Sequence, residues 1–380
     1  MGRTYCDFNA GALLRPEARA AVVAALDAGG NASSIHGFGR RAKALLEDAR
    51  EQVAQYVNAR TDNVVFTSGA TEALHLALDS ARANGFSRLL ASAIEHDALY
   101  QHAQQTWPEV ETIKVDAQGR VDLAALEAQL KAMEGAPLAA IMLANNETGI
   151  IQDFGPIAAL MREAGGALLV DAAQAFGKIP VDIVDLDATY LTLSGHKVGG
   201  PLGAGALVLQ AGAPFSASRF GGGQERGRRP GTENIPALAG FGAAAEVSIR
   251  ELSRENARLG ALRDRFEQLL PDDAVVFSKD GARLPNTSLF ALPGMAAETA
   301  VIALDLAGVA VSSGAACSSG KVRPSRVLEA MGVAPELVRG AIRVSFGWSS
   351  TDADVDAAAG AVREIAARRR SAQKQYEGAA

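Results

Sequence analysis

Short apolar stretches alternate with stretches of helical hydrophobic spacing along the first two thirds of this 380-residue chain. The apolar stretches have the length of buried strands: Asn63–Thr67, Arg88–Ser92, Thr112–Val115, Ala139–Leu143, Ala167–Val170, Ala188–Leu193 and Ala206–Leu209. Helical spacing is found at Pro16–Ala28, Ala42–Val57 and Ala73–Ala83, and the Asn/Ser/Gly-rich segment before Ala42 predicts a loop. Strands that alternate with helices predict an α/β fold with a mostly parallel sheet and helices on both faces.

The last third of the chain has a different pattern. After the glycine-rich segment Phe220–Thr232, a long helix is predicted over Pro236–Leu269. Strand-like and helix-like stretches then follow without regular alternation: Ala274–Phe277, Thr287–Ala291, Glu298–Ala307 and Ala341–Ser345, before a terminal helix. This order predicts a smaller α+β domain beside the first.

Polar residues gather directly after several of the predicted strands. His96, the segment 145–149, Asp171 and Lys197 each follow an apolar stretch. Because the carboxyl ends of parallel strands meet at one edge of a sheet, we expect these residues to share a ligand site. The junction Ser68–Glu72, between a strand and a helix, suits a phosphate because a helix N-terminus presents N–H groups and a positive dipole.

Lys197 lies in the glycine-rich turn SGHKVGGPLGAG, at the end of a predicted strand. Taken alone, this lysine is better explained as a solvated surface residue, and Asp171 can be explained as a helix cap. Together they favour pyridoxal 5'-phosphate, because a lysine can form a Schiff base and a buried carboxylate can pair with a protonated pyridine nitrogen.

Cys317 is the second reactive candidate. It lies in VSSGAACSSG, where small residues on both sides predict a mobile, partly exposed loop. A free cysteine is most often buried and inert, but serine and glycine neighbours do not favour that interpretation here. A thiolate on such a loop can attack a cofactor-bound substrate.

Composition excludes several classes of function. The net charge of -6 does not favour nucleic-acid binding. Asp305 interrupts the longest apolar run, Val301–Val311, so no membrane span is expected, and the N-terminus lacks the pattern of a secretory signal. With only two cysteines, a disulfide framework is not expected, and a cytoplasmic location is favoured. The spacing of histidines and cysteines predicts no metal site.

Several motifs, in this order along the chain, resemble those of one family: NASSIHGFG, SGATEA, EHDA, NNETG, DAAQ, SGHKVGGPLGAG, GGGQERGRRPGTEN, SSGAACSSG and IRVSFG. The chain resembles the pyridoxal-phosphate-dependent cysteine desulfurases, the NifS/IscS-like branch of the class V aminotransferases. This resemblance implies the type I fold of pyridoxal-phosphate transferases, with a mostly parallel seven-stranded sheet. It implies a large cofactor domain at 15–256 and a small domain, made of 1–14 and 257–380, that carries the Cys317 loop.

The resemblance also implies roles for individual residues. Lys197 would form the Schiff base with the cofactor, Asp171 would pair with its pyridine nitrogen, and Gln174 would bind its ring hydroxyl. His96 would stack on the ring and move protons. The phosphate would be held by Ala70, Thr71, Ser194 and His196. For the substrate, Asn145 and Arg343 would receive the carboxylate of L-cysteine, and Cys317 would take up its sulfur as a persulfide. Thr232 would reach the phosphate of the other subunit, which implies a homodimer.

The reaction implied is the conversion of L-cysteine to L-alanine, with transfer of the persulfide sulfur to an iron–sulfur scaffold or another acceptor protein. The GRRPGTEN form is more similar to the nitrogen-fixation members than to the housekeeping ones. Two alternatives stay open: a selenocysteine lyase or other class V enzyme, and a non-catalytic sulfur carrier. The N-terminal segment Tyr5–Ala12 departs from the DNNATT-like form common in the family, which puts its contact with substrate in doubt.

Overall fold

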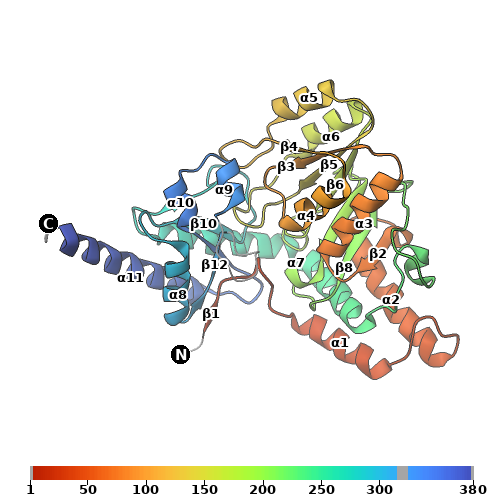
Figure 1. The fold of residues 1–380 in the computed structure, drawn as a ribbon. Helices are drawn as coiled ribbons and strands as arrows, with labels where there is room; N and C mark the ends of the chain where they lie inside the picture. The colour runs from red at the N-terminus through yellow and green to blue at the C-terminus, as the bar shows by residue number, and fades with distance from the viewer. Residues whose placement is uncertain (1–2, 315–323, 378–380) are drawn as a thin grey trace.

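The structure is a computed structural model that describes residues 3–314 and 324–377. Its largest unit is a seven-stranded sheet in the order β2-β8-β7-β6-β5-β3-β4 (Figure 1). The strands are β2 (Val64–Thr67), β3 (Arg88–Ser92), β4 (Val110–Ile113), β5 (Pro137–Met142), β6 (Ala167–Asp171), β7 (Tyr190–Ser194) and β8 (Gly205–Leu209). β8 runs antiparallel to β2 and β7, while the pairs from β7 to β4 are parallel. The predicted mostly parallel seven-stranded sheet is confirmed.

Helices cover both faces of this sheet. They are α1 (Pro16–Ala28), α2 (Gly37–Tyr56), α3 (Ala70–Ala83), α4 (Asp97–Thr106), α5 (Leu123–Ala132), α6 (Phe154–Glu163) and the long α7 (Ile235–Gln268). Successive side chains of a strand point to opposite faces of the sheet. On β6, Leu168 and Val170 join the core beneath α2, α6 and α7, whereas Leu169 joins the core beneath α3 and α4.

Helix α2 begins five residues before the predicted start at Ala42. The His36 side chain caps it, because His36 Nδ1 accepts a hydrogen bond from Gly39 N at 3.2 Å. A side chain at Gly39 would meet Ser34 O at 2.1 Å, so only glycine fits the first turn against the preceding loop. The end of the NASSIHGFG segment is therefore helical, and the prediction of a loop there was wrong.

A second, four-stranded antiparallel sheet has the order β12-β13-β10-β9. Its strands are β9 (Val275–Val276), β10 (Thr287–Ala291), β12 (Ser312–Ser313) and β13 (Ala341–Ser345). The helices around it are α8 (Ala297–Leu306), α9 (Arg326–Ala330), α10 (Pro335–Arg339) and α11 (Asp352–Glu377). One face of β10 and β13 packs on α11 and the end of α7, and the other packs on α9 and α10.

The two sheets are joined by α7 and by the N-terminal segment (Figure 1). Phe241, near the start of α7, belongs to a core of the large sheet, and Phe266, near its end, belongs to the core of the small one. The predicted domain boundary at 256 and 257 falls inside this continuous helix. β1 (Thr4–Tyr5) pairs in parallel with β11 (Val309–Ala310), so the chain starts beside the small sheet.

Among the described residues, no helix has the length and apolar character needed to cross a bilayer. The same part of the chain holds no cluster of three His, Cys, Asp or Glu side chains arranged to bind a metal ion.

Candidate active site

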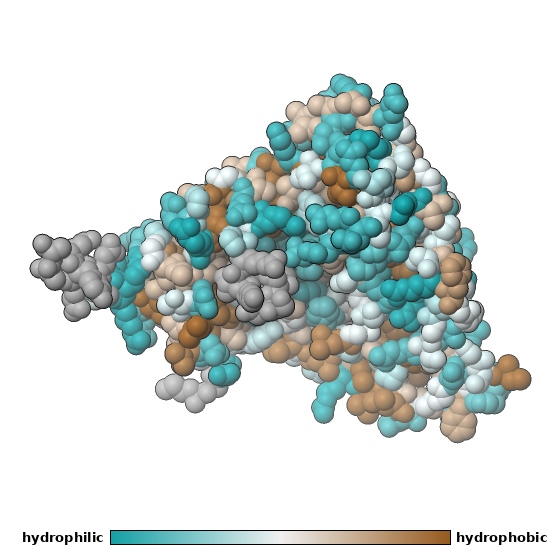
Figure 2. Space-filling model, in the orientation of Figure 1, coloured by the Kyte–Doolittle hydropathy of each residue, from teal (hydrophilic) through white to brown (hydrophobic). Residues whose placement is uncertain are grey.

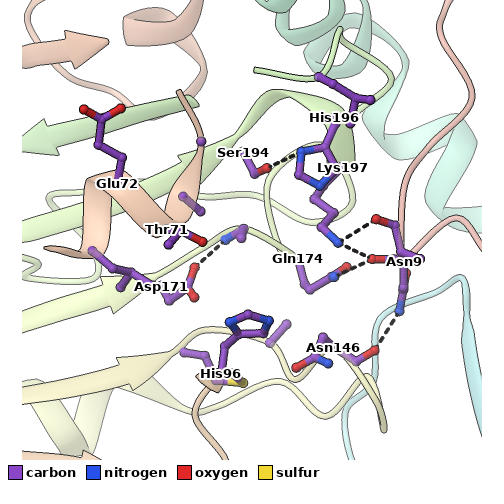
Figure 3. Close-up of a pocket in the computed structure, with 18 of the residues that line it drawn as sticks. Asn9, Thr71, Glu72, His96, Asn146, Asp171, Gln174, Ser194, His196 and Lys197 are labelled. Carbon is purple, nitrogen blue, oxygen red and sulfur yellow. Dashed lines mark hydrogen bonds between the residues drawn. The ribbon is translucent and has the colours of Figure 1, made fainter. Parts of the chain in front are cut away.

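A cavity of about 560 Å³ lies at the carboxyl edge of the large sheet, where the small sheet and the N-terminal segment meet it. Of the predicted site residues, the following line this cavity: Ala70, Thr71, His96, Asp171, Gln174, Ser194, His196, Lys197 and Arg343. They come from five separate segments of the chain, and Figure 3 shows most of them around one space. The expectation that residues after successive strands share one site is met for this set.

Lys197 ends a short 3₁₀ turn, Gly195–Lys197, that follows β7. Its Nζ donates to Asn9 O at 2.6 Å and to Ala10 O at 2.9 Å (Figure 3). Gly199, just beyond, has φ +90°, and a side chain there would meet Arg15 Cγ at 2.7 Å. The glycine-rich turn therefore allows the N-terminal segment to approach Lys197 closely.

Asp171 is the last residue of β6 and is buried. Its Oδ1 accepts hydrogen bonds from Ala173 N at 2.9 Å and from Thr192 Oγ1 at 3.1 Å. Burial raises the pKa of Asp171, while these hydrogen bonds and the nearby His96 and Lys197 lower it. A positively charged group in the cavity would compensate the cost of keeping this carboxylate ionised.

The first turn of α3 forms another wall of the cavity. Gly69 precedes the helix and no side chain caps it, so the N–H groups of the first turn face the space beside Ala70 and Thr71. A side chain at Gly205 would meet Gly69 Cα at 2.6 Å, so β8 can approach this turn only with glycine there. The arrangement suits a phosphate.

Ser194 and His196 lie beside this wall. Ser194 Oγ and His196 Nδ1 are 3.0 Å apart (Figure 3). Burial, and then the charge of Lys197, lowers the pKa of His196 to about 4. His196 is therefore a neutral imidazole near neutral pH, and it can offer a hydrogen bond to an anion without adding charge.

His96 is the residue that precedes α4. Its Nδ1 accepts a hydrogen bond from Ala98 N at 3.1 Å and so caps the helix. In the neutral ring the proton then resides on Nε2. His96 lines the cavity in the neighbourhood of Asp171 (Figure 3).

Arg343 reaches the cavity from β13. Its Nη2 donates to Asp7 Oδ1 at 2.8 Å and its Nη1 donates to Asn146 O at 2.9 Å. The Arg343 side chain is only 2% exposed, and its buried Nε has no hydrogen-bond partner. Held in this way, the guanidinium keeps further N–H groups that a carboxylate can accept from.

Asn145 has a different place from the one expected. Its side chain is fully buried beneath the turn: Oδ1 accepts from Glu147 N and Thr148 N, both at 2.9 Å, and Nδ2 donates to Ile94 O at 3.2 Å. Asn145 does not line the cavity, and its neighbour Asn146 does. The NNETG motif contains both asparagines, and only the geometry of the turn distinguishes them.

The structure gives a different account of the two remaining predicted residues. Thr232 lines a separate pocket of about 300 Å³, together with Glu225, Arg229 and Asn234. Cys317 lies outside the described residues.

Sequence reasoning missed three polar residues of the site. Asn9 carries the carbonyl that Lys197 and Gln174 both bind, Asp7 pairs with Arg343, and Lys178 donates to Gln174 Oε1 at 2.7 Å. Asn9 and Asp7 lie in the N-terminal segment that departs from the family's usual form, so the resemblance supported Asn9 only weakly and Asp7 not at all. Lys178 lies four residues after Gln174, and this spacing could have indicated that the two side chains are close together.

The residues present fit pyridoxal phosphate. The buried carboxylate of Asp171 is matched by a protonated pyridine nitrogen, and the open turn of α3 is matched by a phosphate. The volume of the cavity is in the range of ordinary cofactor sites. Lys197 reaches the same space with its amine.

Comparison with known proteins agrees with these features. Residues 4–358 match the family described as aminotransferase class-V. A curated cysteine desulfurase of Gluconacetobacter diazotrophicus is 40% identical, over 100% of this chain and 97% of its own length. "Cysteine desulfurase IscS 1" of Archaeoglobus fulgidus is 38% identical, over 86% of this chain and 87% of its own. Among solved structures, a NifS-like protein from Rickettsia africae superposes with a TM-score of 0.88 at 33% identity, covering 96% of this chain and 99% of its own.

Proposed function

We propose roles for the residues of this cavity on the premise that the chain belongs to the aminotransferase class-V family and is a cysteine desulfurase that depends on pyridoxal phosphate. One observation carries the proposal: Lys197, Asp171 and Arg343 line the same cavity although they belong to three separate strands and turns. An amine, a buried carboxylate and a buried guanidinium are the groups that a pyridine cofactor and an amino-acid substrate need.

Bound in the cavity, pyridoxal phosphate supplies an electron sink for bonds broken at the α-carbon of the substrate. Asp171 would keep the pyridine nitrogen protonated, Gln174 would donate to the oxygen of the ring hydroxyl, and the α3 turn with Ser194 and His196 would hold the phosphate. Arg343 binds the carboxylate of L-cysteine through its remaining N–H groups. Asn145 has an indirect role in substrate binding. Its Oδ1 holds the turn in which Asn146 O accepts a hydrogen bond from Arg343.

Lys197 and His96 are the proton carriers. Lys197 would hold the cofactor through its amine, and the same amine would be placed to carry a proton at the α-carbon of the substrate. His96 would lie against the cofactor ring, and its neutral imidazole carries its proton on Nε2, because Nδ1 accepts a hydrogen bond from Ala98 N. Both residues belong to turns at the edge of the large sheet, so the backbone keeps them in position.

Cys317 is the proposed nucleophile. Its thiolate attacks the sulfur of the bound substrate, so that a sulfur–sulfur bond forms as the substrate's Cβ–Sγ bond breaks. The electron pair of the broken bond stays with the three-carbon fragment, which is protonated and released as L-alanine. The sulfur stays on Cys317 as a persulfide, for transfer to an acceptor protein.

We also propose that the enzyme acts as a homodimer in the cytoplasm. Thr232 lies in a pocket separate from its own chain's cavity, which supports a role toward a second subunit. Hydrophobic side chains gather on the surface over α1 and the start of α2 (Figure 2). They include Val23, Leu26, Ile35 and Phe38, of which Ile35 is 90% exposed. An exposed patch of this kind is typical of a protein–protein interface.

The proposed acceptor of the sulfur is an iron–sulfur scaffold protein. The names of the relatives support it, because IscS and NifS-like proteins appear among the similar sequences and structures. The GRRPGTEN segment favours a scaffold used in nitrogen fixation.

The decisive experiment is incubation of the enzyme with L-cysteine alone, followed by mass measurement of the peptide that contains Cys317. We expect an added sulfur atom on Cys317 and release of alanine. Cys317→Ala is expected to keep the absorption spectrum of the bound cofactor and to stop alanine release, and Cys6→Ala is the matched control. Undiminished alanine release from L-cysteine by Cys317→Ala would contradict the mechanism, and release from L-selenocysteine alone would favour a selenocysteine lyase.

A further inference from the structure

Lys178 is a buried lysine that the roles above do not use. It is 7% exposed and lies in the turn region after β6, four residues after Gln174. Its Nζ donates to Gln174 Oε1 at 2.7 Å and to Asn9 Oδ1 at 2.9 Å. Both acceptors are neutral amide oxygens, so Lys178 is not held by a carboxylate at either contact.

This contact determines which end of the Gln174 side chain faces each neighbour. An amide group can be turned over to exchange its oxygen and its NH₂ group, and the surrounding donors and acceptors decide between the two states. Lys178 donates, so it holds the oxygen of Gln174 on its own side. The Nε2 of Gln174 is thereby directed away from Lys178, and it donates to Asn9 O at 2.9 Å.

Asn9 is oriented in the same way. Its Oδ1 accepts from Lys178 Nζ and from Asn286 Nδ2 at 3.0 Å, and its Nδ2 donates to Thr287 Oγ1 at 2.9 Å. The Asn9 carbonyl that receives Gln174 Nε2 also receives Lys197 Nζ at 2.6 Å. Lys178 therefore stands at the base of a short hydrogen-bonded chain that ends at the reactive lysine (Figure 3 shows its members Asn9, Gln174 and Lys197).

The donor role of Lys178 does not depend on its charge. Burial, and then the charges of Lys197 and Arg343, lowers the pKa of Lys178 well below its ordinary value. A neutral amine still has two N–H groups, and the two acceptors use both. The amine therefore has enough N–H groups for both contacts in either charge state.

We propose that Lys178 is a positioning residue that keeps the Gln174 amide turned so that Nε2 donates to the ring hydroxyl oxygen of pyridoxal phosphate. The inference rests on the role proposed above for Gln174. A donor at that oxygen stabilises its negative charge, most strongly when the neighbouring nitrogen of the Lys197 linkage has lost its proton. Lys178 thereby lowers the pKa at which the visible absorption band of the bound cofactor titrates.

The test is a spectrophotometric pH titration of the holoenzyme. Lys178→Met keeps the length of the side chain but removes both donors, so Gln174 can turn over and the apparent pKa of the visible band is expected to rise by about one unit, a tenfold change in the proton affinity. Gln174→Leu is expected to raise it to a similar extent. The double variant is expected to titrate like either single variant, because both changes remove the same hydrogen bond. Lys131→Met, at an exposed lysine paired with Glu127, is the matched control and is expected to leave the titration unchanged.

Lys178→Gln serves as a conservative variant that still carries N–H donors, and it also serves if Lys178→Met does not fold. Its titration is expected to lie closer to that of the wild type. If Gln174→Leu raises the pKa and neither Lys178 variant does, the inference is overturned and the role of Gln174 stands. If Gln174→Leu itself has no effect, the role of Gln174 is overturned and the inference fails with it. Additive shifts in the double variant, or a lower melting temperature with an unchanged titration, would also overturn it.

Discussion

Arg343 Nη2 lies 2.8 Å from Asp7 Oδ1, and this ion pair joins the small sheet to the N-terminal segment at the cavity. Asp7 Oδ2 in turn accepts from Ser312 Oγ at 2.7 Å, and Arg343 Nη1 donates to Asn146 O. The guanidinium is thus fixed from the N-terminal segment and from the turn after β5. A group held in this way is pre-oriented for a second, incoming carboxylate.

Arg343→Lys is expected to raise the KM for L-cysteine at least about tenfold, with a smaller effect on kcat. Lysine keeps the positive charge but loses the planar fork that can bind a carboxylate while still contacting Asp7 and Asn146. Steady-state measurement of alanine release tests this. The control is Arg339→Lys at an exposed position of α10, and an unchanged KM in Arg343→Lys would contradict the substrate role.

Asp171→Asn is expected to lower alanine formation at least about 100-fold, because a neutral amide cannot balance a protonated pyridine nitrogen. The apoprotein should behave differently. Burial raises the pKa of Asp171 in the folded state. Above the ordinary carboxyl pKa, the ionised side chain therefore lowers the free energy of unfolding. The amide variant has no such charge, so this destabilisation is absent.

The two effects are separable by measurement. At pH 7 the melting temperature of the Asp171→Asn apoprotein is expected to equal or exceed that of the wild type, while the activity of the cofactor-loaded enzyme collapses. A variant that loses both activity and apoprotein stability would show that Asp171 acts mainly by supporting the fold.

Glu95→Gln is expected to reduce the pH dependence of stability. Glu95 is 2% exposed, Oε1 accepts from Met142 N at 2.8 Å, and Oε2 has no partner among the described residues. Burial raises the pKa of this carboxyl to about 8. The folded state therefore keeps a proton that the unfolded chain releases, so the stabilisation is complete below about pH 4.5 and is lost as the pH rises to about 8.

Denaturant unfolding at pH 5, 6.5, 8 and 9 measures this directly. The free energy of unfolding of the wild type should fall more between pH 5 and 8 than that of Glu95→Gln, and Glu109→Gln, at a side chain 61% exposed, should follow the wild type. Parallel curves for the wild type and Glu95→Gln would contradict the prediction.

Arg50 and Glu225 form a buried ion pair at the edge of the large sheet. Arg50 Nη1 and Nη2 donate to the two oxygens of Glu225 at 2.6 and 2.9 Å, and both side chains are at most 3% exposed. Glu225 also accepts from Phe66 N at 2.8 Å, and Arg50 donates to Val64 O at 2.9 Å. The pair therefore provides hydrogen-bond partners for two backbone groups of β2, which is an edge strand of the large sheet.

Glu225→Gln is expected to lower the free energy of unfolding by about 3–5 kcal/mol, because it removes the buried counter-ion of Arg50 and leaves only the 40% exposed Glu47, whose Oε1 lies 3.3 Å from Arg50 Nε. Adding Arg50→Met should cost less than the sum of the two single changes, since neither charge then remains. The exposed pair Arg60 and Asp62 is the control, with an expected effect of about 0–1 kcal/mol. If the changes in the free energy of unfolding of the two single variants add up to that of the double variant, this explanation is wrong.

The elements that the sequence predicted best are those set by local periodicity. The strands Arg88–Ser92, Thr287–Ala291 and Ala341–Ser345 have the predicted bounds, and α7 is displaced by one residue at each end. The start of α2 was missed because it depends on a cap by His36 and on the close approach of Ser34 to Gly39. Such a contact is not visible in hydrophobic spacing.

The alternation of strands and helices follows from hydrophobic spacing alone, and so does the edge of the sheet where Asp171 and Lys197 follow their strands. That much is local, because hydrophobic spacing defines each strand and parallel strands end on one side. Tertiary packing selects Asn146 rather than Asn145 to line the cavity and brings Asp7 to Arg343. It also places Asn9 between Lys178 and Lys197. These contacts join segments far apart in the chain through the packing of two sheets, and no periodic pattern encodes that packing.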